Sequence, residues 1–267
     1  MSAFVVIRHY KSCDEQVCKE IIKTGVMSIV NAAFIAGLTT EVHFQVMVLA
    51  SAVMYIFLNV PFGVCLASVP AVIILMYILI YTTHVVKAYQ AMGQLSNIPR
   101  DYMSSEISGF WVAEVYEPVG QSGSSKHEKY MVVDEADVKD GRVLPPKQHQ
   151  KSVIGIVGLT MDMSSPKPGS AWLKYLAVLP SYQRKGVGTA LLNETLSFCK
   201  KTNYRYITLA FSECHHAAKM FFSKQGFELK QTYHRHIVGS LVRVLKYELT
   251  KDLRADESNN KNQSMYF

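Results

Sequence analysis

A long stretch without a single charged side chain constrains the fold of this 267-residue chain more than any other feature. From Val42 to Val86 the sequence contains no Asp, Glu, Lys or Arg. One helix that crosses a bilayer needs about 20 apolar residues, and this stretch is about twice that length. Buried helices of globular proteins rarely run so far without charge, so a soluble helical hairpin is the less favoured alternative. The sequence therefore predicts a membrane segment.

The middle of this segment, residues 59–63, reads NVPFG, which is typical of a turn. We expect two apolar helices, about 42–58 and 64–86, joined at this turn. They either cross the bilayer or dip into it and return. Pro70 either kinks the second helix or marks its start. The expected interfacial anchors are Tyr55, Tyr77 and Tyr81.

The rest of the chain alternates expected strands and helices in a mixed α/β plan. Residues 1–26 form a first strand and a helix for which Asp14 is the expected N-cap. Residues 87–249 carry the remaining elements and a flexible loop at 117–150, and residues 250–267 are expected to be a disordered tail. The expected strands are 3–9, 109–116, 151–161, 171–179, 204–211, 227–233 and 240–249, and the expected helices 87–94, 186–200 and 215–224.

Charge and cysteine content narrow the function classes. The net charge is +7, but the basic residues are spread out, which disfavours a nucleic-acid partner. The five cysteines are an odd number without zinc-site spacing, so we expect neither a metal nor a disulfide framework. An anionic cofactor remains a candidate source of the basic balance.

The segment 176–189, LAVLPSYQRKGVGT, carries the chemistry. An expected strand ends at Pro180, and Gly186 and Gly188 open an expected helix. The first backbone N–H groups of a helix have no internal partner, and the helix dipole adds partial positive charge there, so the site suits a pyrophosphate. Glycines let the phosphates approach closely. The pattern alone is weak, and it lacks the three glycines of the dinucleotide fingerprint.

The neighbouring sequence strengthens the interpretation of this motif. An expected helix with an apolar face follows it, and a later expected helix ends in the segment 224–227, KQGF. Over most of residues 3–11 and 109–249 the chain resembles the GNAT superfamily of N-acetyltransferases. The hydrophobic insert after the first strand and helix resembles the camello-like group, to which N-acetylaspartate synthetase belongs. The resemblance implies a mixed, mostly antiparallel central sheet flanked by helices, with a hydrophobic helical hairpin inserted in the membrane.

The resemblance also implies acetyl-CoA as the acetyl donor. The strand 173–178 would pair its backbone with the pantetheine arm, and backbone N–H groups from Arg184 to Thr189 would hold the pyrophosphate, with added charge from Arg184 and Lys185. The N–H of Val178 or Ala177 would stabilise the oxyanion. The expected cofactor-binding residues are Leu176, Ala177, Val178, Gln183, Arg184, Lys185, Gly186, Val187, Gly188, Thr189 and Phe222.

The sequence departs from the family pattern at two positions. Many members carry an asparagine and a tyrosine where this chain has His215 and Phe222, and the tyrosine protonates the leaving thiolate. Phe222 cannot donate a proton, so this route to general-acid catalysis is in doubt. The candidate catalytic groups are Glu213, His215 and Tyr175. His215 and its neighbour His216 are also open to a surface role on the first turn of the helix. Cys214 is a less favoured nucleophile, because no acyl-cysteine step is needed.

These observations predict a membrane-bound N-acetyltransferase that acts on a primary amine of a small molecule or a protein lysine. The alternatives are a catalytically degenerate acyl-CoA-binding module and a membrane scaffold. If residues 4–8 join the same sheet as residues 109–249, both flanks of the membrane segment emerge on one side. Flanking Lys and Arg favour the cytoplasm for that side, in the endoplasmic reticulum or another intracellular membrane. They are Arg8, Lys11, Lys19, Lys23 and Lys87.

Overall fold

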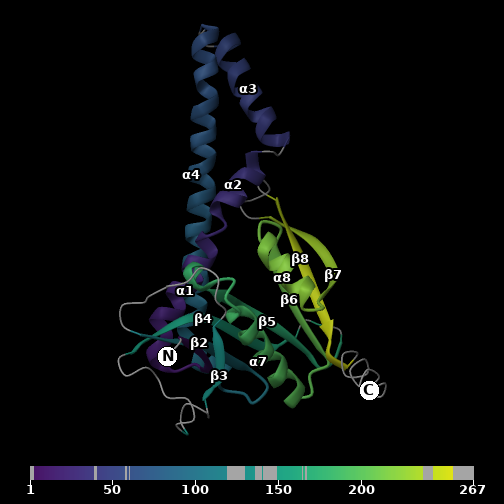
Figure 1. The fold of residues 1–267 in the computed structure, drawn as a ribbon. Helices are drawn as coiled ribbons and strands as arrows, with labels where there is room; N and C mark the ends of the chain where they lie inside the picture. Colours follow the sequence, from purple (N-terminus) through teal and green to yellow (C-terminus); the bar gives the residue numbers. More distant parts are fainter. Residues whose placement is uncertain are drawn as a thin grey trace. The chain divides into compact units, whose positions relative to one another are not determined.

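The computed structural model describes residues 3–38, 41–57, 59, 61–118, 130–135, 140, 149–163, 165, 167–236 and 243–254. The chain divides into two compact units (Figure 1). The first contains residues 1–25 and 91–267, and the second contains residues 26–90. The hydrophobic insert is therefore a unit of its own within the α/β domain.

A mixed sheet forms the first unit, with strands in the order β3-β1-β2-β4-β5-β6-β8-β7. Neighbouring strands are antiparallel except β1 with β3 and β5 with β6, which are parallel. This arrangement confirms the predicted mixed, mostly antiparallel sheet. The strands are β1 (Phe4–His9), β2 (Gly109–Pro118), β3 (Met131–Asp134), β4 (His149–Met161), β5 (Ser170–Val178), β6 (Tyr206–Ser212), β7 (Glu228–His236) and β8 (Arg243–Asp252).

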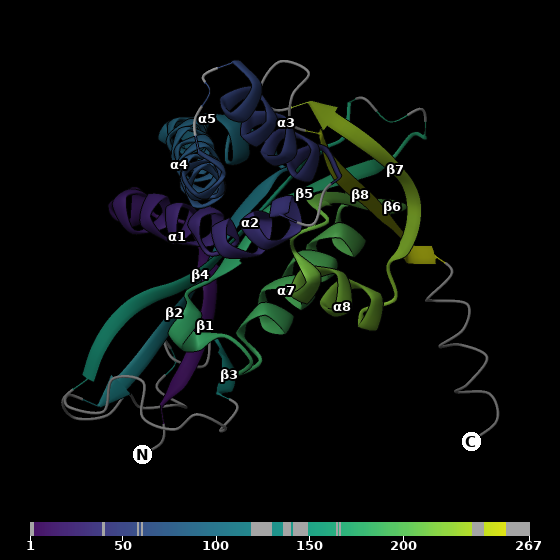
Figure 2. The ribbon, with the colours of Figure 1, turned by 90° about the horizontal axis from the view of Figure 1, so that it is seen from above.

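Helices cover both faces of this sheet (Figure 2). The helices α7 (Val187–Lys201) and α8 (His216–Lys224) lie on one face, and α1 (Glu15–Met27) and α5 (Ile98–Tyr102) lie on the other. Successive residues of β2 alternate between the faces, as a strand requires. Trp111 packs edge-on against Phe198 of α7, and Phe110 packs edge-on against Tyr102 of α5.

The second unit consists of apolar helices. They are α2 (Val30–Leu38), α3 (Glu41–Phe57) and the part of α4 (Phe62–Gln94) up to Gln90. α3 and α4 confirm the two predicted apolar helices, but α4 continues through Pro70 and absorbs the separate helix predicted at 87–94. α2 was not predicted. It packs on α4 through Phe34, whose ring centroid lies 5.2 Å from that of Tyr77.

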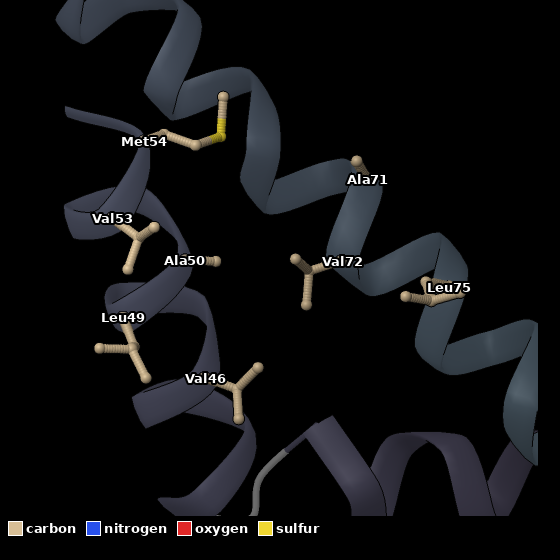
Figure 3. A pocket seen from close by; sticks show the side chains of 8 residues that line it. All are labelled: Val46, Leu49, Ala50, Val53, Met54, Ala71, Val72 and Leu75. Carbon is tan, nitrogen blue, oxygen red and sulfur yellow. The ribbon is translucent and has the colours of Figure 1, made fainter. Parts of the chain in front are cut away.

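By length and composition, two helical stretches of the described residues could cross a membrane, Ser12–Leu38 and Phe62–Tyr102. The apolar stretch Gln45–Phe57 of α3 is shorter. An apolar groove of about 520 Å³ separates α3 from α4. Val46, Ala50 and Val72 point into the space between the two helices (Figure 3).

The structure corrects two predicted boundaries. Residues 250–252, expected in the disordered tail, belong to β8, because Thr250, Lys251 and Asp252 pair with Thr208, Ile207 and Tyr206 of β6. The predicted flexible loop 117–150 contains β3, which adds to the sheet beside β1. Most of that loop and the tail after residue 254 lie outside the described residues.

Candidate active site

The parallel pair β5 and β6 separates partway along its length. The two strands pair only from Ser170 to Trp172 with Tyr206 to Thr208. Beyond this point β5 stays paired with β4 as far as Val178, and β6 stays paired with β8 as far as Ser212. Their facing edges therefore open into a wedge that is lined by backbone groups without a partner strand. Such groups are strong hydrogen-bonding partners for an extended ligand.

A bulge in β5 lies beside this wedge. Ile156 pairs with Ala177 and Gly158 pairs with Lys174, so Tyr175 and Leu176 together oppose the single residue Val157. Tyr175 has a φ of 58°, in the left-handed region that side chains rarely adopt. A bulge bends its strand and increases its twist. It therefore gives a local reason for the departure of β5 from β6.

The register decides which backbone groups of β5 face the wedge. The N–H of Leu179 donates to the carbonyl of Ile154, with 2.8 Å between the atoms. Because bonded and non-bonded pairs alternate in an antiparallel ladder, Ala177 is directed toward β4 and Val178 toward the wedge. The side-chain amide of Gln183 donates to the Val178 carbonyl at 2.9 Å. Of the two expected oxyanion donors, only Val178 has its N–H on the open side.

The loop after β5 forms a concave backbone cradle. Arg184 and Gly186 have φ values of 64° and 89°, and Gly186 is the N-cap of α7. The first helical hydrogen bond runs from the N–H of Ala190 to the carbonyl of Gly186, at 3.0 Å. The N–H groups of residues 187–189 consequently have no acceptor within the helix, and no side chain caps this end. Such a cradle at a helix N-terminus suits an anion.

The two strand–helix connections approach each other at Gly188. A Cβ built on Gly188 would lie 3.9 Å from Cγ2 of Val178 and 3.9 Å from Cζ of Phe221. Val178 ends β5, Gly188 opens α7 and Phe221 belongs to α8. The cradle thus lies next to the wedge, and a single extended ligand can reach both.

The aromatic residue beside the cradle is Phe221, which sequence reasoning missed. The expected ligand-binding residue, Phe222, is only 6% exposed. Its ring stacks on Phe211 with centroids 6.1 Å apart, and it packs edge-on against Phe227 at 5.3 Å. The helical phase of α8 directs Phe222 into the core and Phe221 toward α7. The only signal in the sequence was that two phenylalanines are adjacent, so that either one could face the cradle.

The side chain of Lys185 also differs from expectation. It is buried, and its ammonium lies over the rings of Tyr130 and Tyr182. Arg184, by contrast, is exposed. Of the two basic residues of this loop, Arg184 is therefore the one whose charge stays accessible to a ligand.

Of the three candidate catalytic residues, Tyr175 lies on β5, and Glu213 and His215 lie in the connection from β6 to α8. Glu213 follows β6, and its carboxylate accepts the N–H of Leu245 at 3.3 Å. His215 is the N-cap of α8, and its N–H donates to the carbonyl of Ser212 at 3.0 Å. Tyr175, on β5, donates its hydroxyl to Oε1 of Gln94 at 2.7 Å. Burial raises the pKa of Tyr175, so this side chain is a phenol at neutral pH.

This geometry defines an α/β protein with a site that suits an extended, phosphate-bearing ligand between two diverging parallel strands. Residues 111–227 match the family model described as Acetyltransferase (GNAT) family. N-acetyltransferase family 8 member 3 of Rattus norvegicus is 25% identical over 261 residues, which cover 92% of this chain and 96% of the relative. N-acetyltransferase family 8 member 7 of Mus musculus is 26% identical over 266 residues, which cover 94% and 97%.

Among solved structures, a GNAT-family acetyltransferase from Staphylococcus aureus is 14% identical. The match covers 93% of this chain and 99% of that chain, with a TM-score of 0.46. Residues 111–227 thus carry a GNAT acetyltransferase domain, and the family match and the related sequences support an N-acetyltransferase.

Proposed function

We propose that this chain is a membrane-bound N-acetyltransferase that moves an acetyl group from acetyl-CoA to a primary amine of a small molecule or a protein lysine. The observation that carries the proposal is the wedge between β5 and β6, which opens beside the backbone cradle of residues 184–189. An elongated ligand with an amide-bearing arm and a pyrophosphate matches both parts.

The donor site fits the residues present. The part of β5 that no longer pairs with β6, residues 173–178, offers backbone groups to the pantetheine arm. The N–H groups of Val187, Gly188 and Thr189 serve the pyrophosphate together with the helix dipole. Arg184 adds positive charge, and Phe221 covers Gly188 from α8. The bound thioester supplies an electrophilic carbonyl carbon.

The chain's own groups then act on the attacking amine and on the developing charge. The N–H of Val178 faces the wedge and stabilises the oxyanion when the amine attacks directly. Glu213 or His215, at the end of β6, accepts the ammonium proton directly or through water. Tyr175 does not act as the base, because its raised pKa keeps it protonated. Phe222 is buried in the core, so the thiolate leaves without help from that position.

The second unit supports membrane binding. Large apolar side chains are exposed along α3 and α4, including Ile56, Phe57, Phe62, Leu66 and Ile74, each at least 60% exposed. Water-soluble proteins rarely expose contiguous apolar surface of this extent. β1 and β2, which flank the insert in sequence, pair in one sheet. The chain therefore returns to the side on which it entered, and by the flanking basic residues we assign that side to the cytoplasm of an intracellular membrane.

Coenzyme A release by detergent-purified protein tests the proposed activity. Acetyl-CoA is supplied with amino acids, cysteine conjugates, polyamines or lysine peptides, and the released thiol is measured. The control carries Gly186→Glu and Gly188→Glu, which place negative charge in the cradle. Amine-dependent release that the control lacks is the expected result. Acetyl-CoA binding without release for any amine would instead favour the degenerate binding module, to which the phenylalanine at position 222 points.

Extraction tests the membrane proposal separately. The full chain should stay in the membrane pellet after alkaline carbonate treatment and move to the supernatant only with detergent. Release by carbonate alone would contradict membrane insertion and leave the acetyltransferase activity as a separate question.

A further inference from the structure

A buried lysine occupies the middle of the cradle loop. Lys185 is only 5% exposed. Its Nζ lies 5.1 Å from the ring centroid of Tyr130 and 5.6 Å from that of Tyr182. The same atom lies 3.5 Å from the hydroxyl oxygen of Tyr130. An ammonium removed from water in this way needs compensating partners, and aromatic faces and a hydroxyl oxygen supply part of that compensation.

The compensating negative charge comes from Glu117, which is 6% exposed. Its Oε1 accepts the hydroxyl of Tyr130 at 2.7 Å, and its Oε2 accepts the hydroxyl of Tyr182 at 3.1 Å. Two phenols thus bridge a buried carboxylate and a buried ammonium. We name Glu117, Tyr130, Tyr182 and Lys185 the tyrosine bridge.

The tyrosine bridge also holds the backbone of the loop. The N–H of Tyr130 donates to the carbonyl of Lys185 at 3.1 Å. Lys185 lies between Arg184 and Gly186, the two residues with left-handed φ values. For a residue with a side chain, such as Arg184, this conformation costs about 1 kcal/mol or more, so it persists only where surrounding contacts enforce it. The bridge provides contacts on both sides of Arg184, at Tyr182 and at Lys185.

We propose that Glu117, Tyr130 and Tyr182 are positioning residues that shape the cradle for the pyrophosphate of acetyl-CoA. The inference rests on the proposed donor site and deepens it, because Glu117 and Tyr130 lie outside the segment 176–189 and Tyr182 precedes its glycines. Glu117 is the last residue but one of β2, and Tyr130 precedes β3, so both are remote from the motif in sequence.

Kinetics with two acetyl donors distinguish a role in positioning the cradle from a general effect on the stability of the protein. S-acetylpantetheine carries the thioester and the amide arm but lacks the pyrophosphate. In Tyr182→Phe and in Glu117→Gln, the KM for acetyl-CoA should rise about tenfold, because a hydrogen bond to a buried carboxylate is lost. The kcat should stay within about twofold, and the kinetics with S-acetylpantetheine should not change. Tyr130→Phe provides a third variant should Glu117→Gln fail to fold.

Tyr204→Phe is the matched control. Tyr204 is also buried and donates its hydroxyl at 2.7 Å, but to the carbonyl of Ile107. It should lose a similar amount of stability without a selective effect on acetyl-CoA. Equal losses with both donors, or an unchanged KM for acetyl-CoA in the bridge variants, would overturn the positioning role. Wild-type protein that fails to bind coenzyme A in a calorimetric titration would overturn the proposed donor site as well.

Discussion

The hydroxyl of Tyr175, at the bulge of β5, donates a hydrogen bond to Oε1 of Gln94, the last residue of α4, with 2.7 Å between the oxygen atoms. The ring of Tyr175 also packs edge-on near Tyr102, with centroids 6.4 Å apart. These contacts hold a residue whose backbone is left-handed, with a φ of 58°. The side chain therefore stabilises the bulge that borders the wedge.

Tyr175→Phe should lower kcat about three- to tenfold, because removal of one hydrogen bond costs about 0.5–1.5 kcal/mol. The KM for acetyl-CoA should change little, since the cradle lies on a separate loop. Steady-state kinetics with both substrates measure the two parameters. Tyr89→Phe, at an exposed tyrosine of α4, should leave both unchanged. A large rise in the KM for acetyl-CoA would show that Tyr175 acts on the donor instead.

The pH dependence of Tyr175→Phe distinguishes a structural phenol from a catalytic base. Burial raises the pKa of Tyr175 above its ordinary value of 10.0, so the side chain keeps its proton across neutral pH. The variant should therefore lose activity by a constant factor from pH 6 to pH 9. Activity that no longer rises with pH in the variant would identify Tyr175 as the base.

Gly186 and Gly188 should respond differently to alanine. A Cβ at Gly186 would meet nothing within 4 Å, but its φ of 89° is unfavourable for alanine by about 1–2 kcal/mol. Gly186→Ala should therefore weaken coenzyme A binding about five- to thirtyfold. At Gly188 a Cβ makes ordinary contacts and alanine favours the helix, so Gly188→Ala should raise the melting temperature slightly. Calorimetric titration and thermal melts measure the two effects, and equal losses of binding at both positions would contradict this view of the cradle.

Gly109 allows the buried indole of Trp111 to lie against the backbone. A Cβ at Gly109 would lie 2.3 Å from Cη2 of Trp111. Gly109→Ala should destabilise the protein by about 1–3 kcal/mol, because the indole must move within a packed core. Tryptophan fluorescence during urea unfolding measures the change. Gly93→Ala, in α4 with no atom near the new methyl group, should be neutral or stabilising. An unchanged midpoint for Gly109→Ala would show that the core adapts.

A buried ion network should control acid stability. The guanidinium of Arg8 binds Asp14 at 2.7 Å and Glu114 at 3.0 Å. Burial alone would raise the pKa of each carboxyl, but hydrogen bonds from Arg8 hold both below their ordinary values of 3.8 for Asp14 and 4.5 for Glu114. Depressed carboxyl pKa values add stability that is present above the unfolded values and is lost as the pH falls through the folded ones. The melting temperature should therefore be flat from pH 7 to about pH 5 and fall steeply below pH 4.

Asp14→Asn tests this assignment. It should cost about 3 kcal/mol at pH 7, because it removes one of the two negative charges that bind the buried guanidinium of Arg8. The loss of stability below pH 4 should be smaller than in the wild type, since one titrating carboxyl is gone. Melting temperatures from pH 3 to pH 7 measure both effects. If the melting temperature of the variant falls below pH 4 as steeply as that of the wild type, other carboxyl groups must cause the loss of stability in acid.

The periodicity of apolar residues and the distribution of charge were sufficient to predict the local features of the chain. The charge-free stretch predicted two apolar helices, and α3 and α4 confirm them within a few residues at most ends. The motif at 176–189 predicted a strand, a glycine loop and a helix, and β5, the left-handed residues Arg184 and Gly186, and α7 follow in that order. These features depend on side-chain polarity and on residue-specific backbone preferences, which neighbouring residues in the sequence express directly.

Tertiary packing decided the features that depend on remote partners. Asp14 was expected to cap the helix that follows it, yet its carboxylate binds Arg8 and accepts the N–H of Lys11. Lys185 was expected to add its charge to the cradle, yet Tyr130 and Tyr182 enclose it. β3 and the end of β8 depend on pairing with β1 and β6.

The sequence by itself thus determined the α/β class, the apolar insert and the position of the glycine loop, because each is set by local composition and spacing. Only the tertiary structure decided that β5 leaves β6 after Trp172, that Val178 rather than Ala177 faces the wedge, and that Phe221 rather than Phe222 lies beside Gly188. Strand register, a bulge and helical phase set these directions. Each results from contacts between segments that are distant in the sequence.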